Sequence, residues 1–485
     1  MNSLAIWLVA LPLIAAVLAA LLPRRGAEIT LATVLGTLIA AIGLVSLVGQ
    51  HGPVVYALSG WEPGLGIALR ADTLAATLVL MSSAITTAIS WYASGYFSSA
   101  NTRAHFWPIW LLMIAALHAM LLSADLFNLY VTLELLALSA VTLAALDGSR
   151  GAVTAAIRYL VVGLLGSMAF LAGVVVVYAH YGTLNMLALT GMMTAEPAAW
   201  LALVMLSTGL LIKSALFPLH FWLPAAHANA PAPVSAALSA LVVKAAVYLT
   251  MRLWLDLFQP VLSSEISWLL GLLGAAAVLW GSWQAFRAQR LKLLAAYSTI
   301  AQIGYLFLFF PLLAGLPAGP LRDATFGALV VMALTHGFAK SALFLAAGMI
   351  QHQGGHDRIE DLGGTARALP ITTFTLALAG IALIGLPPSG AFLAKWQLLS
   401  TAFAQGQWFW IIVVAAGSLL AAAYIFRVLG FAFGPGEAVG HPLTDGQEEL
   451  PPLLLAIIAT VVLGFGAAII WDFVATAVPP TGVPG

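Results

Sequence analysis

The chain has 485 residues, of which 62% are hydrophobic and 7% are charged, and its formal net charge at pH 7 is zero. Soluble domains carry about 25% charged residues, so this composition excludes an ordinary soluble protein, and the zero net charge gives no field that favours nucleic acid. The lack of cysteine excludes disulfides, thiolate catalysis and cysteine-ligated zinc or iron–sulfur clusters.

Apolar stretches of membrane-spanning length follow one another along the whole chain. The first of them lacks the basic start of a signal peptide, so it is expected to remain as a membrane helix. A spanning helix needs about 20 apolar residues, and this criterion predicts an all-α membrane protein with about 14 transmembrane helices. They are expected at residues 3–22, 29–48, 74–97, 107–123, 125–146, 154–180, 199–223, 234–256, 266–286, 291–313, 323–350, 371–398, 408–433 and 452–476.

Basic residues lie mainly in the loops or helix ends that follow odd-numbered helices. These are Arg24, Arg25, Arg103, Arg150, Arg158, Arg287, Arg290, Lys292, Arg358, Arg367 and Arg427. The corresponding positions after even-numbered helices hold only Arg70, Arg252 and Arg322. The positive-inside rule therefore predicts a multi-pass protein of a prokaryotic inner membrane with both termini on the outer face.

A short series of ionisable residues lies inside the apolar stretches. The series is Glu134, Lys213, Lys244, His336, Lys340 and Lys395. A charge at the bilayer centre costs about 2.5–3.5 kcal/mol on insertion scales, so such residues face the protein interior or water. Ion pairing is the structural alternative, but one glutamate cannot neutralise four lysines. A series of buried lysines that can each gain and lose a proton favours a proton relay.

Proline and glycine interrupt two of the predicted helices beside these lysines. The interrupting residues are Pro218 and Pro224 after Lys213, and Pro387, Pro388 and Gly390 before Lys395. Proline frees backbone carbonyls, which a membrane tolerates only where protein or a water-filled cavity satisfies them. A simple kink would give a similar pattern, but transporters use such discontinuous helices at ion sites.

The two interrupted helices are the seventh and the twelfth, so they run in opposite directions. This arrangement is typical of inverted repeats. The sequence therefore predicts N-terminal helices at 1–106, one five-helix repeat at 107–256, its inverted counterpart at 257–433, and a loop with a last helix at 434–485.

Six motifs are distributed between residues 124 and 399. They are "PLHFWLPAAHANAPAPVSAALSALVVKAAVYLTMR" (218–252), "ADLFNLYVTLELLALSAVTL" (124–143), "LLAAYSTIAQIGY" (293–305), "THGFAKSALFLAAG" (335–348), "HDRIEDLGG" (356–364) and "GLPPSGAFLAKWQLL" (385–399). Together they resemble the proton-conducting antiporter-like subunits of respiratory complex I, membrane-bound hydrogenases and Mrp-type multisubunit Na+/H+ antiporters. The resemblance implies 14 helices, five-helix inverted repeats and proton transfer along a central hydrophilic axis. Within this family the chain looks most like the Mrp D-type subunit, because it lacks room for a long lateral helix or a large C-terminal extension.

The same resemblance implies a role for each buried ionisable residue. Glu134 looks like the fifth-helix glutamate that pairs with the seventh-helix lysine, Lys213, and Lys244 looks like the lysine that links the two half-channels. His336 and Lys340 resemble the eleventh-helix continuation. Lys395 looks like the twelfth-helix residue on the exit side, where some family members have glutamate.

Four further polar residues are weaker candidates. His220 and His227 match the motif after the seventh-helix break and would gate the entry of water. Tyr297 and Ser298 would line the water path, although ordinary interhelical hydrogen bonding predicts the same residues. No metal site and no cofactor are predicted, because no ligand set for flavin, iron–sulfur or haem is evident.

Three functions remain open at this point. The first is a proton-translocating subunit of a multisubunit cation/proton antiporter, which has no enzyme activity of its own. The second is the membrane module of a redox-driven pump, and the third is the membrane subunit of an energy-coupled inorganic-carbon accumulation complex. All three predict other membrane subunits as partners, including a second antiporter-like chain in the first case. The transported ions would be protons and, in an antiporter, Na+.

Overall fold

The computed structural model describes residues 4–57, 67–436 and 447–476 and is mostly helical. One small antiparallel hairpin is present, formed by β1 (Val54–Ala57) and β2 (Ala68–Ala71). The α-helices are α1 (Leu4–Leu21), α2 (Gly26–His51), α3 (Thr73–Tyr96), α4 (Ala100–Leu122), α5 (Leu126–Ala144), α6 (Arg150–Tyr181), α7 (Met186–Thr190), α8 (Pro197–Lys213), α9 (Leu223–Asn229), α10 (Ala232–Ala237), α11 (Val243–Arg252), α12 (Ser264–Arg287), α13 (Leu291–Phe307), α14 (Phe309–Ala314), α15 (Pro320–Gly354), α16 (Thr365–Ala368), α17 (Pro370–Ile384), α18 (Gly390–Ala404), α19 (Trp408–Phe433), α20 (Leu450–Ile457), α21 (Leu463–Phe465) and α22 (Ala467–Ala475).

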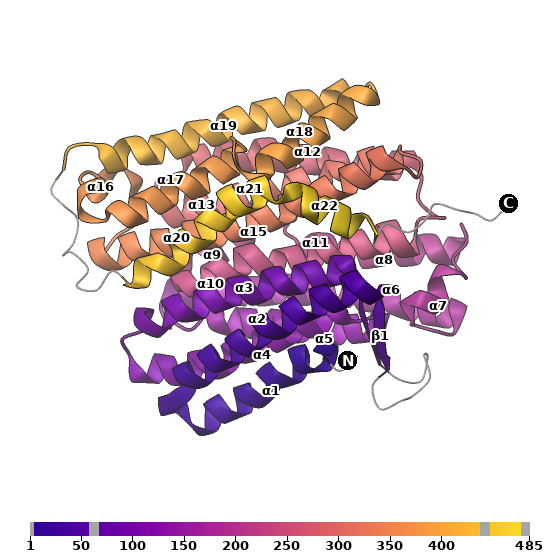
Figure 1. The fold of residues 1–485 in the computed structure, drawn as a ribbon, viewed down its shortest axis with the longest axis horizontal. Coiled ribbons are helices and arrows are strands. Elements are labelled where there is room, and N and C mark those ends of the chain that lie inside the picture. Colours follow the sequence, from indigo (N-terminus) through magenta and orange to yellow (C-terminus); the bar gives the residue numbers. More distant parts are fainter. Residues whose placement is uncertain (1–3, 58–66, 437–446, 477–485) are drawn as a thin grey trace.

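Most helices lie side by side along the long axis of the molecule (Figure 1). The N-terminal helices form one side of the bundle and α17 to α19 form the other, with α15 between them. Helix α15 packs against α3 and α10 on one side and against α13, α17 and α18 on the other. It is buried over almost its whole length, so it is the central helix of the fold.

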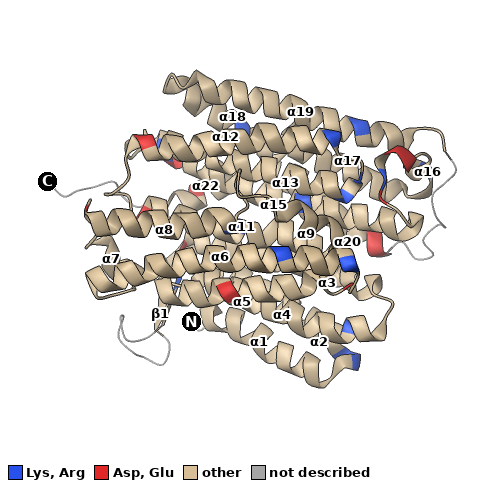
Figure 2. Cartoon of the chain, turned by 180° about the vertical axis from the view of Figure 1, so that it is seen from behind, with Lys and Arg blue, Asp and Glu red and all other residues tan. Residues whose placement is uncertain are grey.

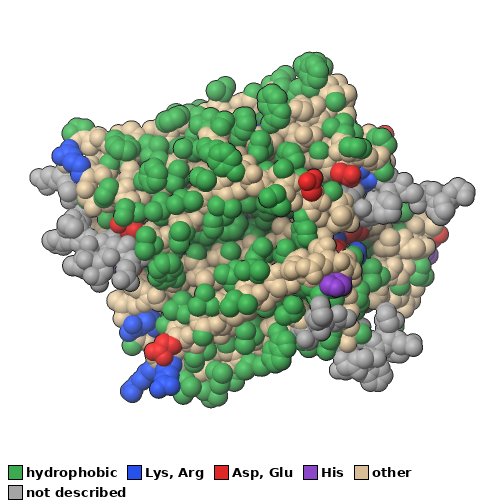
Figure 3. Space-filling model, in the orientation of Figure 1, with side chains coloured by type: hydrophobic (Ala, Val, Ile, Leu, Met, Phe, Trp, Pro, Cys, Tyr) green, Lys and Arg blue, Asp and Glu red, His purple; other side chains and the backbone are tan. Residues whose placement is uncertain are grey.

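Eleven helices in the described residues are long and apolar enough to cross a membrane, and a twelfth span results if the pair bent by 71° at Gly466 counts as one. Two shorter apolar helices, α8 and α17, correspond to the expected spans 199–223 and 371–398. Each expected span is divided, because the chain leaves α8 after Lys213 and leaves α17 after Ile384. Side chains exposed on the outside of the bundle are largely hydrophobic (Figure 3), as a lipid-facing surface requires.

The helix breaks differ from the expectation in one respect. Pro218 lies in the turn after α8, and Pro387 and Pro388 lie in the turn after α17, as expected. Pro224, in contrast, interrupts nothing: it lies in the first turn of α9, where no helical partner for its missing N–H is needed. Gly390 likewise begins α18 and does not break a helix.

Glycine allows two helix pairs to pack at very short range. A Cβ atom on Gly209 of α8 would lie 2.5 Å from the carbonyl oxygen of Gly166 on α6, and one on Gly304 of α13 would lie 2.5 Å from that of Gly274 on α12. Such small-residue contacts are the usual way that membrane helices approach closely. They position α8 and α13, which carry residues of the candidate site.

Lysine and arginine gather at the end of the bundle that carries α16 (Figure 2). Arg158 and Arg427 were expected in loops or at helix ends, but they lie within α6 and α19. Arg252 lies at the end of α11, as expected, but it is buried and pairs with Asp72 and Asp256. The start of α1 and the last turn of α22 both lie towards the other end of the bundle, which carries β1 (Figure 1). Residues 437–446 of the expected last loop lie outside the described part of the chain.

Candidate functional site

Lys213 and Glu134 form an ion pair between α8 and α5. The Lys213 Nζ lies 3.2 Å from Glu134 Oε1, and the two side chains are only 9% and 17% exposed. Lys213 is the last residue of α8. The Ile212 oxygen at this helix end accepts the Ala215 backbone N–H at 3.1 Å and the Trp222 indole N–H at 3.0 Å. The following turn and the indole therefore satisfy this carbonyl, and the ammonium remains available for the carboxylate.

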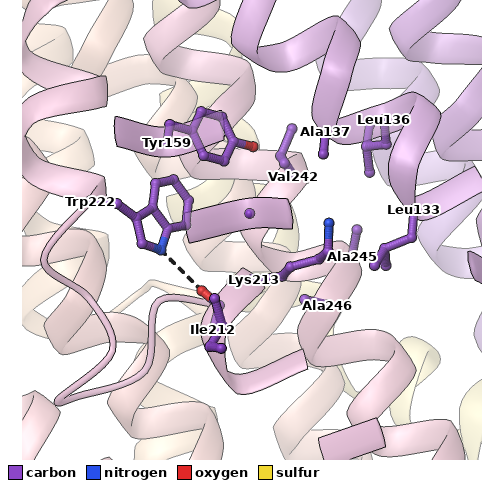
Figure 4. Close-up of a pocket in the computed structure, with 11 residues that line it drawn as sticks. Leu133, Leu136, Ala137, Tyr159, Ile212, Lys213, Trp222, Val242, Ala245 and Ala246 are labelled. Carbon is purple, nitrogen blue, oxygen red and sulfur yellow. Dashed lines mark hydrogen bonds between the residues drawn. The ribbon is translucent and has the colours of Figure 1, made fainter. Parts of the chain in front are cut away.

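A small cavity of about 20 Å³ lies beside Lys213 (Figure 4). Besides the lysine, it is lined by Tyr159 and Trp222 and by apolar side chains of α5 and α11. Val242, Ala245 and Ala246, which flank Lys244 in the sequence, form the wall on the α11 side. A water needs roughly 10–15 Å³, so the cavity has room for one water but provides no continuous polar route to Lys244.

Lys244 begins a hydrogen-bonded series in the centre of the bundle. It follows a π-helical turn, Leu238–Val242, and its ammonium donates to the Ser239 carbonyl oxygen at 2.9 Å. The Ser239 hydroxyl lies 2.7 Å from the Thr299 hydroxyl, which donates to the Ala295 oxygen of α13 at 2.9 Å. π-Turns occur often at functional sites because they leave the backbone irregular.

Lys340 of α15 reaches the same point of α13 from the other side. Its ammonium donates to the Ala295 oxygen at 2.9 Å and also to the Ser298 hydroxyl. Ala295 therefore accepts hydrogen bonds from both Thr299 and Lys340. We call the connected set Lys244, Ser239, Thr299, Lys340 and Ser298 the central row. All five side chains are buried.

Two buried histidines adjoin the central row. His336 lies one turn before Lys340 on α15, and His227 of α9 packs against Phe344, one turn after Lys340, with ring centroids 5.6 Å apart. Neither imidazole makes a hydrogen bond to any described residue. A buried polar group without a partner is costly, so these rings are natural sites for bridging water.

Lys395 of α18 lies behind the second helix break. Its ammonium donates to the oxygen of Ile384, the last residue of α17, at 2.9 Å, and to the Ser418 hydroxyl at 3.0 Å. It also lies 4.1 Å from the centroid of the Tyr305 ring. The Gln302 amide donates to the neighbouring Leu383 oxygen at 2.8 Å. Because Gln302 follows Ser298 by one helical turn, it extends the central row towards Lys395.

A wide cavity of about 480 Å³ opens at the basic end of the bundle. It is lined by residues 228–231, which follow His227, and by Asp147, Arg290, Lys292 and His352. Lys292 is buried and donates to the Ala230 oxygen, while Arg290 pairs with Asp357 at 2.8 Å. We call the wide cavity the entrance cavity, because it leads from the surface to the segment that carries His227.

Two of the expected residues lie away from the central row. His220 accepts a hydrogen bond at 3.2 Å from Trp280, whose ring is largely exposed on α12. Tyr297 is half-buried, and its hydroxyl makes no hydrogen bond to a described residue, whereas the adjacent Ser298 faces Lys340. Tyr297 and His220 therefore lie at the edge of the bundle.

Sequence reasoning missed Ser239, Thr299, Gln302, Ser418 and Lys292. Serine and threonine are common in membrane helices and usually bond to their own backbone, so they give little signal. The only available signal was the spacing of Ser298 and Gln302, four residues apart on one helix face. Lys292 was interpreted as a loop cation because it lies at the very start of a predicted span.

The chain is similar to known membrane proteins in sequence and in overall structure. Residues 123–421 match the family model for NADH:quinone oxidoreductase/Mrp antiporter, transmembrane. The chain is 36% identical to the N-type subunit of NADH-quinone oxidoreductase from Desulforudis audaxviator, over 98% of both chains. It is 28% identical to the D-type subunit of the Na(+)/H(+) antiporter from Alkalihalophilus pseudofirmus, over 91% of this chain and 88% of that one. A protein of the Mrp complex from Dietzia sp. superposes with a TM-score of 0.88 at 25% identity, covering 99% of this chain and 98% of that one.

Proposed function

The chain belongs to the NADH:quinone oxidoreductase/Mrp antiporter family of transmembrane proteins, and we propose that it is the proton-translocating subunit of a multisubunit cation/proton antiporter. The observation that carries the proposal is the central row, in which Lys244 bonds to the backbone of Ser239, the Ser239 hydroxyl bonds to Thr299, and Thr299 and Lys340 share the Ala295 oxygen. Ionisable residues are costly inside a membrane, and where they occur they commonly mark ion pathways. Relatives with antiporter names support the cation/proton part of the proposal.

The proposed architecture counts 14 helices. This number includes the eleven long spans and the bent pair α20–α22, which counts as one. The last two are the shorter helices α8 and α17, each counted together with its continuation, α9 or α18. The regions 107–256 and 257–433 are the two inverted repeats, between 1–106 and 434–485. The basic end with α16 faces the cytoplasm and both termini lie outside, since Lys and Arg favour cytoplasmic loops.

The proposed pathway has three stages. Protons enter from the basic end through the entrance cavity, pass His227, and reach the central row at Lys340 and Lys244. They continue past Ser298 and Gln302 to Lys395 and then leave. His336 is a bridging site for water beside Lys340.

The Glu134–Lys213 pair is the coupling element. Crossing between Lys213 and Lys244 requires a water in the small cavity, because its other lining groups offer no continuous polar route. The Glu134 side chain is 17% exposed, and a change in its charge would alter the charge that Lys213 holds. His220, at the edge of the bundle, is a candidate for admitting water near the α8 break.

A redox-driven pump is the second candidate function. The 36% identity to a subunit of NADH-quinone oxidoreductase exceeds the 28% identity to a D-type antiporter subunit, and it covers nearly the whole chain. The same proton pathway would then be driven by electron transfer in partner subunits. The partner subunits therefore decide between the two functions.

Purification of the tagged chain in mild detergent, with mass spectrometry of the proteins that accompany it, tests the proposal. An antiporter subunit should bring small membrane subunits and a second antiporter-like chain, and the reconstituted complex should exchange protons for Na+ without a redox substrate. Flavin or iron–sulfur proteins in the purified complex, with proton movement only when they are reduced, would contradict the antiporter function and support the pump.

A further inference from the structure

A buried arginine without a partner among the described residues lies at the end of the bundle opposite the basic residues. Arg322 is the third residue of α15 and is only 5% exposed. Its Nη1 is buried with no hydrogen-bond acceptor, and the described residues provide no ion pair for the guanidinium. Asp323, next in the chain, is half-buried and does not pair with it in that part of the chain. Burying an unpaired guanidinium with five donors is costly, so the native environment should supply an acceptor.

Arg322 lines a cavity of about 140 Å³, here called the Arg322 cavity. This volume is well above the roughly 10–15 Å³ that one water needs. The Gln259 amide and the Ser267 hydroxyl also line it, and the rest of the described lining is apolar, with no acidic residue. The Ser267 hydroxyl donates to the Ser263 oxygen of its own helix at 3.2 Å, so Gln259 is the neutral donor of the site. The site thus combines one positive charge with one neutral donor, next to the first turn of a long helix, whose free N–H groups favour anions. These groups suit a tetrahedral oxyanion better than water alone.

The position of the cavity indicates where the anion comes from. Its walls are the start of α12, the end of α14 and the start of α15, so it lies at the level where membrane helices end and lipid headgroups begin. Leu321, which precedes Arg322 on α15, is 39% exposed. This apolar side chain faces the bilayer and can contact acyl chains.

We propose that the Arg322 cavity binds the phosphate group of a membrane phospholipid on the side of the bundle that carries the β-hairpin. The guanidinium pairs with the phosphate oxygens, and the Gln259 amide donates to a remaining oxygen. The acyl chains lie along the apolar surface beside Leu321. The bound lipid fills the space between α12 and α15 and joins helices of the second half of the chain.

Native mass spectrometry of the purified, delipidated complex tests the site. Dioctanoyl phosphatidylglycerol should bind, and Arg322→Gln should weaken that binding roughly 10- to 100-fold, because a charge-assisted hydrogen bond to phosphate is lost. Arg322→Lys should lose less, since it keeps the charge without the planar fork. Arg367→Gln, which removes a cation at the opposite end of the bundle, should leave binding unchanged.

Two results would overturn the proposal. Equal lipid binding by the wild type and Arg322→Gln would mean that the cavity holds only water. Displacement of the lipid by inorganic phosphate, at concentrations similar to those of the lipid, would mean that a free anion is the natural occupant. If Arg322→Gln does not assemble, Gln259→Ala serves as the second variant. It should weaken lipid binding roughly 3- to 10-fold, and unchanged binding would equally contradict the site.

Discussion

The two helix breaks of the chain place a lysine in very different surroundings. At the first, Lys213 pairs with Glu134, and Trp222 caps the carbonyl of Ile212. At the second, no described carboxylate pairs with Lys395, and the lysine itself caps the carbonyl of Ile384. The charge of Lys213 is balanced by a full opposite charge, whereas that of Lys395 is balanced by neutral dipoles and an aromatic face.

Their connections to the centre of the bundle also differ. Between Lys213 and Lys244 the structure has a largely apolar cavity with room for one water. From Lys244 to Lys340 polar groups follow one another closely: Lys244 bonds to the Ser239 carbonyl oxygen, the Ser239 hydroxyl to Thr299, and Thr299 and Lys340 to the Ala295 oxygen. Gln302, one turn further along α13, lies towards Lys395. We propose a division of labour on this basis, in which the first break controls transfer and the second conducts.

Among the changes that compare the two breaks and their connections, the largest effect is expected from Lys395→Ala. This change removes the ammonium at the second break and leaves the Ile384 carbonyl without its cap, so proton transfer should fall roughly 100-fold or more, as for loss of a proton-transfer group. The measurement is pH-gradient-driven proton uptake by the reconstituted complex. Gln397→Ala is the matched control, because Gln397 lies on the same helix and its amide donates to Thr401. Transport at the wild-type rate by Lys395→Ala would show that the second break does not conduct.

Glu134→Gln should have an intermediate effect. The neutral amide keeps the shape of the side chain but no longer balances the ammonium, so transport should fall roughly 10-fold, a change of about 1.4 kcal/mol. The pH profile of transport should change at the same time. A lower rate with an unchanged pH profile would mean that Glu134 only neutralises a charge, and the first break would then not be a control point.

The smallest effect is expected from Thr299→Val. Valine has nearly the same shape but cannot bridge Ser239 and Ala295. The loss of one net hydrogen bond is worth about 1 kcal/mol, which corresponds to roughly a fivefold lower rate. Rates that stay within error of the wild type would argue that water, not the hydroxyl, connects Lys244 to Lys340. Thr142→Val, which removes an exposed hydroxyl that bonds to its own helix, is the control.

The sequence predicted the charged parts of the site better than the neutral parts. Buried lysines and a glutamate are rare in membrane helices, so the sequence drew attention to Glu134, Lys213, Lys244, Lys340 and Lys395, and the structure brings the first two into contact. Their roles in proton transfer stay a prediction. The hydroxyls between the lysines carry no comparable signal, because a threonine that bridges two helices has the same sequence pattern as one that bonds to its own turn.

The same reasoning applies to the fold. Hydrophobic length located most spans, and the prolines located both breaks to within a few residues. The hairpin of β1 and β2 was missed because each strand has only four residues and the two are separated along the chain. The burial of Arg252 was missed because its partner Asp72 is distant in sequence and only the fold brings them together.

Proton uptake by the Lys244→Ala complex, beside Thr250→Val from the same helix, tests the central claim most directly. Lys244 is the point where the first half of the chain meets the central row, while Thr250 is also buried but donates to Ala246 of its own helix. We predict that the assembled Lys244→Ala complex does not transport protons and that Thr250→Val transports them at nearly the wild-type rate. Wild-type transport by assembled Lys244→Ala would contradict a relay through the central row.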